Sequence, residues 1–407
     1  MRLLPIVFSL CAPLWASAQF YWAQRADLPT SGLWGPSFFT IGDKGYVVSG
    51  CTDGTNVTNV WMYDPEADSW TPRAPIPVAR RFGAGFAING KGYVACGLGG
   101  PHMNDLWEYD PVADSWTSRA DFPGDPRYGT HYFALNGKGY VGSGNTGSSS
   151  GLYVSDMFVY DPVLNSWSSV ADLPGLARYG TSTMTASGRA FVFGGLLSNG
   201  QHSGDIYEYE PTTDVWTLRP SIPGATRTYA MALSYSWEGV IAAGKSGAGV
   251  NVYDGFRYLP GSNAWTAIPD YPGEAGWVGA TLAVSGRSFG GLGYILAEYT
   301  DHNDWWELVK EGEGIVEVGL GSAGALVLSP NPVRPGEVMN FDRIMLGDGA
   351  WDLAIISMEG RQVYVGGHRK NDRFACPLLA EGSYCLVLRA KDGTTLTGRF
   401  VISDSSE

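Results

Sequence analysis

Gly45-Tyr-Val-Val-Ser-Gly50 is the first clear copy of a phrase that returns as Gly92-Tyr-Val-Ala-Cys-Gly97 and Gly139-Tyr-Val-Gly-Ser-Gly144. When the whole sequence is aligned on this phrase, its final glycine occurs six times, at Gly50, Gly97, Gly144, Gly195, Gly244 and Gly293. The spacings are 47, 47, 51, 49 and 49 residues, and the residue before the glycine is small in five copies. Self-similarity at a fixed period is the signature of a repeat architecture.

Two further phrases accompany this one in most repeats. A Tyr-Asp-Pro or Tyr-Glu-Pro triplet is followed by four residues and a tryptophan, with the tryptophans at Trp70, Trp116, Trp167 and Trp216. Each repeat therefore predicts four strands. The first resembles residues 83–88 and ends in an Asn-Gly turn, the second is the Tyr-Val phrase, the third ends at the proline, and the fourth begins at the tryptophan. No repeat shows a helical period.

Four-stranded units repeated at about 50 residues are typical of a β-propeller. The small residue and glycine after the second strand, with the spaced Tyr and Trp, resemble the kelch family over roughly residues 22–306. The strict Gly-Gly pair occurs only at Gly194-Gly195, so the resemblance is to a divergent member. It implies an all-β fold with a six-bladed kelch-type propeller over residues 19–310.

The fourth strand occurs seven times for six blades when Trp22 and Trp305 are both counted. We expect the segment around Trp22 to supply the outer strand that closes the ring. The alternative is that blade six closes itself with residues 305–309.

Residues 1–18 have the pattern of a secretory signal peptide. Arg2 supplies a positive charge, residues 3–15 are mostly apolar, and Ala16-Ser17-Ala18 is a small-residue cleavage site. The apolar stretch is too short to cross a bilayer, and no later segment has the length of a transmembrane helix. The sequence therefore predicts a secreted protein without a transmembrane segment.

Residues 311–325 are rich in Gly and Glu and predict a linker, and residues 326–407 predict a small C-terminal β-sandwich. This last part resembles the C-terminal sorting domain of the type IX secretion system through Ser329-Pro-Asn-Pro332, Glu359-Gly-Arg361, Gly382-Ser-Tyr384 and Gly398-Arg-Phe-Val-Ile402. The resemblance implies the type IX machinery as a partner and a route to the outer-membrane surface or the extracellular medium. Cys376 and Cys385 either pair across neighbouring strands or remain free thiols.

The loops between the second and third strands differ from blade to blade, so function is expected on the face that carries them. A first ring of residues on this face contains Leu33, Arg80, Arg127, Arg178, Arg227 and Gly276. Four arginines would suit an anion. However, the third strands are expected to begin at Asn59, Asp105, Asp156, Asp205, Asp254 and Ile295, so Arg and Asp occur together in blades two to five. This pattern favours structural ion pairs.

A second ring on the same face contains Trp34, Arg81, Tyr128, Tyr179, Thr228 and Trp277. Aromatic side chains at a propeller opening suit stacking on the faces of sugars. The alternative is that these rings only pack between blades.

The net charge of -13, without a basic run, argues against nucleic acid as a partner. The galactose oxidase type of kelch protein needs paired histidines around copper, but His102, His131, His202 and His302 stand apart, so neither metal nor cofactor is predicted. We predict a binding protein for a glycan or protein ligand. The alternative is a mutarotase of the sialic acid type, with an acid–base pair and the ring arginines holding the carboxylate.

Overall fold

The computed structural model describes residues 19–147, 152–235, 238–274, 277, 279–295 and 300–311, and seven strands of the C-terminal region. Contacts divide the chain into two units, of which one is Gln19–Glu311 and the other holds the C-terminal region. The predicted signal peptide and residues 312–325 of the predicted linker lie outside the described residues.

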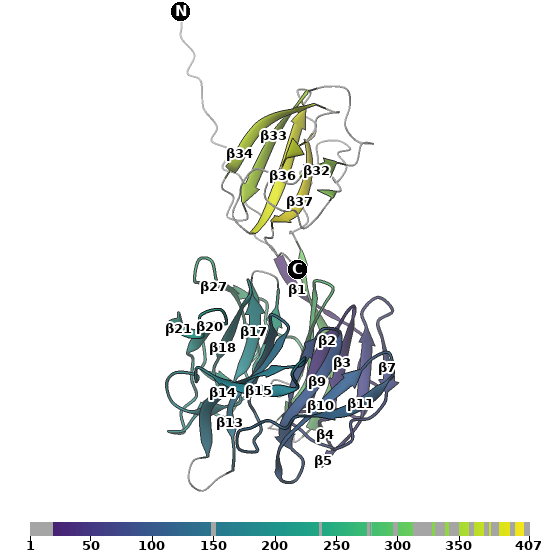
Figure 1. Cartoon of the computed structure of the whole chain (residues 1–407), viewed down its shortest axis with the longest axis vertical. Coiled ribbons are helices and arrows are strands. Elements are labelled where there is room, and N and C mark those ends of the chain that lie inside the picture. Colours follow the sequence, from purple (N-terminus) through teal and green to yellow (C-terminus); the bar gives the residue numbers. More distant parts are fainter. Residues whose placement is uncertain are drawn as a thin grey trace, which may run out of the picture. The chain divides into compact units, whose positions relative to one another are not determined.

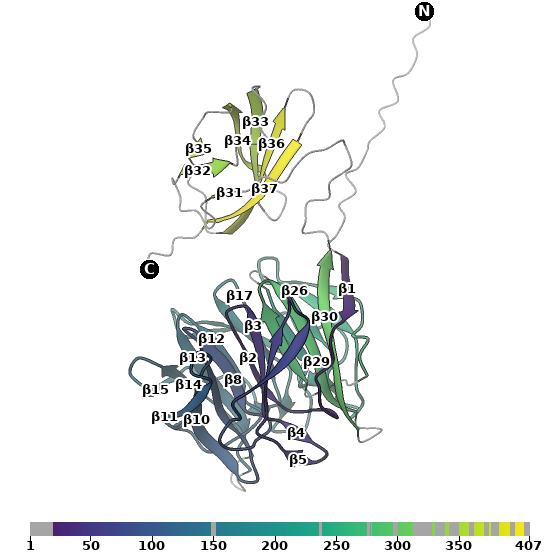
Figure 2. The same cartoon turned by 90° about the vertical axis from the view of Figure 1, so that its right-hand side faces the viewer.

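Six antiparallel sheets of four strands each form the Gln19–Glu311 unit (Figures 1 and 2). Blade one contains β2 (Ser37–Ile41), β3 (Lys44–Val48), β6 (Val60–Asp64) and β7 (Ser69–Arg73). Blade two contains β8 (Ala84–Ile88), β9 (Lys91–Leu98), β10 (His102–Asp110) and β11 (Ser115–Arg119). Blade three contains β12 (His131–Leu135), β13 (Lys138–Asn145), β14 (Tyr153–Asp161) and β15 (Ser166–Val170).

Blades four to six repeat this order of strands. Blade four contains β17 (Ser182–Ala186), β18 (Arg189–Phe193), β20 (Ile206–Glu210) and β21 (Val215–Arg219). Blade five contains β23 (Met231–Ser234), β24 (Gly239–Ala242), β26 (Gly255–Leu259) and β27 (Ala264–Ile268). Blade six contains β28 (Ala280–Val284), β29 (Arg287–Ile295), β30 (Thr300–Glu311) and, from the other end of the unit, β1 (Gln19–Gln24).

The first strands of the six blades surround a common axis. They contact one another in a closed cycle, in the order β2, β8, β12, β17, β23, β28 and back to β2. This arrangement confirms the six-bladed propeller expected from the six repeat glycines.

Strand β1 closes the ring. It pairs antiparallel with β30, with Trp22 opposite Leu308, and the side chain of Phe20 is buried in a cluster that includes Leu308. The Arg25 guanidinium forms an ion pair with Glu307 at 2.5 Å. The expectation for Trp22 is therefore confirmed. The alternative was wrong, because Trp305 lies in β30, the third strand of blade six, where it is fully buried.

The Tyr and Trp phrases bind each blade to the blade before it. The tryptophan indoles donate to one carbonyl of the preceding blade at 2.8–3.1 Å, in the pairs Trp70–Ala26, Trp116–Ala74, Trp167–Ala120, Trp216–Ala171, Trp265–Pro220 and Trp22–Pro269. The N–H of each of the four alanines donates to an Asp or Asn side chain at 2.9–3.0 Å, on Asp68, Asp114, Asn165 and Asp214. The same oxygen accepts the hydroxyl of a buried tyrosine, Tyr63, Tyr109, Tyr160 or Tyr209.

The repeat glycines occupy a backbone conformation that suits glycine. In blade two, for example, Cys96 and Gly97 have φ values of 59° and 113°, and the register of β9 and β10 shifts near this pair. The N–H of Gly97 donates to the carbonyl of Arg127 in the next blade at 2.8 Å. A glycine is required because L-residues rarely adopt a φ of this size. The repeat phrase thus marks an irregularity that turns the backbone toward the next blade.

The C-terminal unit is described only by its strands, which form two antiparallel sheets. One contains β31 (Leu328–Ser329), β32 (Val338–Phe341) and β35 (Phe374–Ala375), and the other contains β33 (Ala350–Ser357), β34 (Gln362–Arg369), β36 (Gly382–Ala390) and β37 (Thr395–Ile402). Strands β36 and β37 pair antiparallel, with Tyr384 opposite Phe400. Residues 330–332, 359–361 and 376 lie outside the described residues, so the two alternatives for Cys376 and Cys385 both stay open. The part of the chain that is described contains no helix able to span a membrane.

Deleting residues 19–27 should destabilise the propeller, because β30 then becomes an open edge and the burial of Phe20 is lost. Removing a buried phenylalanine ring alone costs about 3–5 kcal/mol, so we expect the melting temperature to fall by roughly 10 °C or more. Calorimetry of the deletion variant measures this. Tyr21→Ala, which removes a side chain of β1 that is 40% exposed, is the matched control and should leave the melting temperature nearly unchanged. A deletion variant that melts at the wild-type temperature would contradict the closing role of β1.

Candidate ligand-binding site

The predicted second ring lies at one end of the propeller axis, which we call the mouth. In each blade, one residue of this ring pairs across to the residue that follows the repeat glycine. The pairs are Trp34–Cys51, Arg81–Leu98, Tyr128–Asn145, Tyr179–Leu196, Thr228–Lys245 and Trp277–Tyr294. Tyr179 and Leu196 belong to the two-residue strands β16 (Arg178–Tyr179) and β19 (Leu196–Leu197), and Thr228 and Lys245 to β22 (Arg227–Thr228) and β25 (Lys245–Ser246). One more short pair, β4 (Cys51–Thr52) and β5 (Thr55–Asn56), lies in the loop of blade one.

Seven aromatic rings form a closed circuit at the mouth. Successive ring centroids lie 5.5–6.3 Å apart in the order Trp34, Phe82, Tyr128, Tyr179, Tyr229, Trp277, Tyr294 and back to Trp34. Phe82 and Tyr229 also meet each other at 5.3 Å. All seven residues are partly exposed, so their rings are at once packed together and accessible.

The structure therefore brings the expected Trp34, Tyr128, Tyr179 and Trp277 into one cluster. Thr228 belongs to the same ring of positions but is 5% exposed and contributes no aromatic surface. Phe82, Tyr229 and Tyr294 were not predicted as members of this cluster. For Phe82 and Tyr229 a signal was present at the position after the predicted ring. This position is glycine in blades one, three and four and a large aromatic residue in blades two and five, as Gly35, Phe82, Gly129, Gly180 and Tyr229.

Phe82 and Tyr229 adopt left-handed backbone conformations, with φ values of 58° and 49°. Bulky residues rarely adopt this region, and such strain persists only where surrounding structure enforces it. Here the backbone is held by hydrogen bonds that run from blade to blade, in the steps Phe82 N–H to Gly35, Gly129 to Phe82, Gly180 to Gly129 and Tyr229 to Gly180, at 2.7–3.2 Å. The ring of blades thus positions both side chains at the centre of the mouth.

Two cations stack on the tryptophans of the mouth. The Arg81 guanidinium lies 5.1 Å from the centre of the Trp34 ring and donates to the Asn56 side chain at 2.8 Å, and the Lys245 ammonium lies 5.0 Å from the centre of the Trp277 ring. Such cation–π contacts orient the indoles and place hydrogen-bond donors beside them.

The phenols of the mouth stay protonated at neutral pH. Burial raises the pKa of Tyr128, Tyr179 and Tyr229 above the ordinary value for tyrosine. The Tyr128 hydroxyl accepts a hydrogen bond from Asn145 at 3.0 Å. The mouth therefore offers aromatic faces together with neutral hydroxyl and amide groups.

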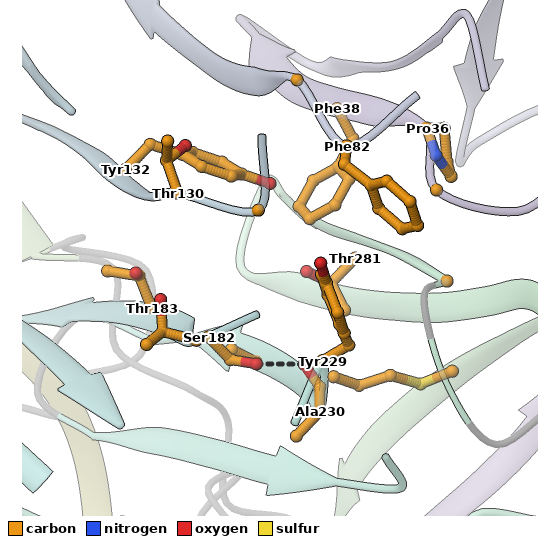
Figure 3. Close-up of a pocket in the computed structure, with 17 residues that line it drawn as sticks. Pro36, Phe38, Phe82, Thr130, Tyr132, Ser182, Thr183, Tyr229, Ala230 and Thr281 are labelled. Carbon is orange, nitrogen blue, oxygen red and sulfur yellow. Dashed lines mark hydrogen bonds between the residues drawn. The ribbon is translucent and has the colours of Figure 1, made fainter. Parts of the chain in front are cut away.

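A chamber of about 90 Å³ lies on the axis beside the mouth and is lined by the inner segments of all six blades (Figure 3). Phe82 and Tyr229 belong to both its wall and the aromatic circuit, so they lie between the two spaces. The hydroxyls of Thr130, Thr181 and Tyr229 are buried and have no hydrogen-bond partner among the described residues, whereas Ser182 donates to the Ala230 carbonyl at 2.7 Å. The lining of the chamber is mainly apolar, with these hydroxyls among its polar groups, and the chamber has room for several water molecules.

The ring arginines do not open onto the mouth as free cations. Their side chains are at most 2% exposed, and each forms an ion pair within its own blade, in the pairs Arg80–Asp105, Arg127–Asp156, Arg178–Asp205 and Arg227–Asp254. Each guanidinium also donates to the carbonyl of the small residue before the repeat glycine, on Cys96, Ser143, Gly194 and Ala243. The arginines therefore hold the start of the first strand to the end of the second strand, and the ion-pair prediction is confirmed.

One part of that prediction was wrong. The residue that matches the ring aspartates in blade six is Asp304, not Ile295, because β30 and not residue 295 provides the third strand. Asp304 accepts hydrogen bonds from the Trp306 indole at 2.8 Å and from the Tyr271 hydroxyl at 3.1 Å, and burial raises its pKa. Blade six thus has the aspartate but not the arginine, and the Tyr271 hydroxyl donates to Asp304 where the other blades have an ion pair.

The histidines are dispersed, as the sequence indicated. His131 is fully buried, and this burial lowers its pKa to about 3, while its Nδ1 contacts the Ser143 hydroxyl at 2.5 Å. The His102 ring is tilted against the Tyr128 ring, with 5.3 Å between the ring centroids. The described residues contain no group of three or more His, Cys, Asp or Glu side chains that could hold a metal ion.

Replacing Arg127 by Met should lower the free energy of unfolding by about 2–3 kcal/mol, since the Ser143 carbonyl and Asp156 lose their donor. Asp156→Ala should lower the free energy of unfolding further, by about 3–5 kcal/mol, because it leaves the charge of a fully buried arginine without its partner. Chemical denaturation measures both. Lys138→Met, which breaks an exposed ion pair with Asp161 at 3.4 Å, is the matched control and should change stability by less than ~1 kcal/mol. Loss of ligand binding in Arg127→Met at unchanged stability would contradict the structural role.

Comparisons with known proteins agree with this fold. The Kelch motif model matches residues 35–77, and the chain is similar to the solved structure of YjhT, with a TM-score of 0.61, 16% sequence identity, and coverage of 71% of this chain and 99% of that chain. No curated protein matches the sequence. At this level of identity the likeness concerns the fold alone. The chain thus carries a Kelch motif and folds as a six-bladed β-propeller of the same architecture as YjhT.

Proposed function

We propose that this protein binds a carbohydrate ligand at the mouth of its propeller. The observation that carries the proposal is the closed circuit of seven partly exposed aromatic rings, with Arg81 and Lys245 stacked on its two tryptophans. A kelch propeller suggests a binding role in general, and the mouth supplies the chemistry that selects a ligand class.

Aromatic faces that remain exposed at a concave position favour ligands with flat apolar faces and a polar edge. A sugar ring has both, because its C–H groups form one face and its hydroxyls form the rim. The protonated phenols of Tyr128 and Tyr179, in partly exposed residues, supply hydrogen-bonding partners for that rim. A protein ligand is the other class that such a surface admits, through its own aromatic or apolar side chains.

A sugar mutarotase is the second candidate. In that candidate the ring arginines were to hold the substrate carboxylate, but all four are buried and paired with aspartates. The candidate therefore has to rely on other residues of the mouth for both binding and proton transfer. NMR measurement of anomerisation, applied to any sugar that binds, separates the two functions.

We further propose that the protein is exported and that its C-terminal unit directs passage through the type IX machinery to the cell surface or medium. The support is the order of four sequence motifs in this unit and the signal-peptide pattern of residues 1–18. The antiparallel pairing of β36 with β37 is compatible with this, since both carry motif residues.

Binding of the full chain to a glycan array tests the main proposal. Trp277→Ala should weaken binding of the best glycan at least ~10-fold, since a central aromatic contact is worth above 1 kcal/mol. Tyr21→Ala, on the outer strand β1, removes an exposed ring away from the mouth and should change binding less than ~2-fold. Equal binding by both variants, or an array without any bound glycan, would contradict a carbohydrate site at the mouth.

Expression in a bacterium that has a type IX system tests the export proposal. Deleting residues 326–407 should leave the propeller in the periplasm, because the recognition signal of the outer-membrane step is lost while the signal peptide is kept. Cell fractionation with an antibody to the propeller measures this. Equal amounts of intact and truncated protein outside the cell would show that the C-terminal unit has another role.

A further inference from the structure

A pocket of about 280 Å³ lies at the mouth where blade six meets blade one, and we call it the seam pocket. Its lining includes Ser31, Trp34, Asp53, Tyr294, Thr300 and Asp301. The volume is comparable to that of a site for a single small ligand. The pocket therefore offers a more confined place than the open aromatic circuit of which Trp34 and Tyr294 are members.

At the seam pocket the backbones of blades one and six approach each other closely. Blades one and six have no ring arginine, and Gly32 instead lies directly against Asp301, where an added Cβ would come within 2.5 Å of the Asp301 Cβ. The backbone of Leu33 is bound to blade six on both sides, since its N–H donates to the His302 carbonyl at 3.1 Å and its carbonyl accepts from Gly293 at 2.8 Å. This close approach places Asp301 of blade six beside residues of blade one.

Two aromatic residues form one side of the pocket. The centroids of Trp34 and Tyr294 are 5.5 Å apart and their planes are inclined by 46°. Rings set at such an angle form a corner in which a flat apolar face can rest on one ring while its edge meets the other.

Two carboxylates form the other side. Asp301 accepts a hydrogen bond from the Asp53 backbone N–H at 2.7 Å, which fixes its position. Within the described parts of the chain, neither Asp301 nor Asp53 forms an ion pair with a lysine or arginine. Arg81, the cation nearest to Trp34, is occupied with Trp34 and Asn56. Burial raises the pKa of Asp301 and the charge of Asp53 adds to this, while the Asp53 backbone N–H and the nearby His302 act in the opposite direction.

We propose that the seam pocket holds one sugar residue that is uncharged or carries an amino group, stacked against Trp34 and Tyr294 with its hydroxyl or ammonium donors on Asp301 and Asp53. The inference rests on the proposed function and specifies its ligand class. The two carboxylates accept hydrogen bonds and repel anions, so uronic, sialic and sulfated sugars are excluded from this pocket. The ligand charge expected for the seam pocket is therefore opposite to that of the anion site suggested by the ring arginines.

The test uses the full chain on an array that presents matched uncharged, amino and acidic sugars on the same scaffolds. We expect binding to the uncharged or amino members and not to their acidic counterparts. Asp301→Ala should weaken this binding at least ~10-fold, as for the loss of a charge-assisted hydrogen bond. Asp172→Asn, a change at an exposed carboxylate outside the pocket, is the control and should bind as the wild type does.

Asp301→Asn is a second variant for the case that Asp301→Ala unfolds, because it keeps the shape of the side chain and removes the charge. It should lose most of the preference for an amino sugar over its uncharged counterpart. Binding of acidic sugars alone, or unchanged binding by both Asp301 variants while Trp277→Ala still abolishes it, would overturn the seam pocket and leave the mouth as a carbohydrate site. An array without bound glycan would overturn both.

Discussion

Each blade of this propeller holds the backbone of one residue of the blade before it. The indole of the fourth strand donates to the carbonyl of that residue, and in four blades an Asp or Asn accepts the N–H of the same residue, as Asp114 does for Ala74. The carboxylate is in turn fixed by a buried tyrosine hydroxyl, here Tyr109 at 2.6 Å. Because every partner is satisfied, the contact stabilises the junction between blades and also sets its geometry. The six first strands are thereby kept around one axis.

The functional chemistry lies where the repeats differ. The tryptophans of the interblade contact and the repeat glycines recur from blade to blade, whereas the mouth positions vary from Gly35 to Phe82 and from Thr228 to Trp277. The closure is the least regular place, since β1 returns from the N-terminal end and Tyr271 replaces the missing arginine as partner of Asp304. The seam pocket lies at this closure, so the same irregularity that completes the ring also provides a confined site.

The fold could be predicted from the sequence because each blade uses the same residues at the same spacing to contact the blade before it. The repeat of the sequence therefore reports the repeat of the structure. The six glycines gave the number of blades, and the joint occurrence of Arg and Asp in blades two to five revealed the ion pairs. The error in blade six arose from Trp305. Since it had been counted as a fourth strand, the third strand was placed too early, at Ile295 in place of Asp304.

The site could be predicted only in part, for a geometric reason. Residues of one ring, such as Trp34 and Tyr128, follow from the repeat. The contact between Phe82 and Tyr229 joins blades two and five across the axis, and no period in the sequence indicates which large side chains meet there. The seam pocket likewise depends on Gly32 and Asp301, which are far apart in the chain and are brought together only by closure of the ring.

Sugar binding in the mouth can be tested with a crystal structure of the full chain in complex with the glycan that binds it best. We expect a sugar ring stacked on the aromatic circuit, with a hydroxyl or ammonium group within hydrogen-bond distance of Asp301. A glycan seated on the outer strands of the blades or on the C-terminal unit would contradict it.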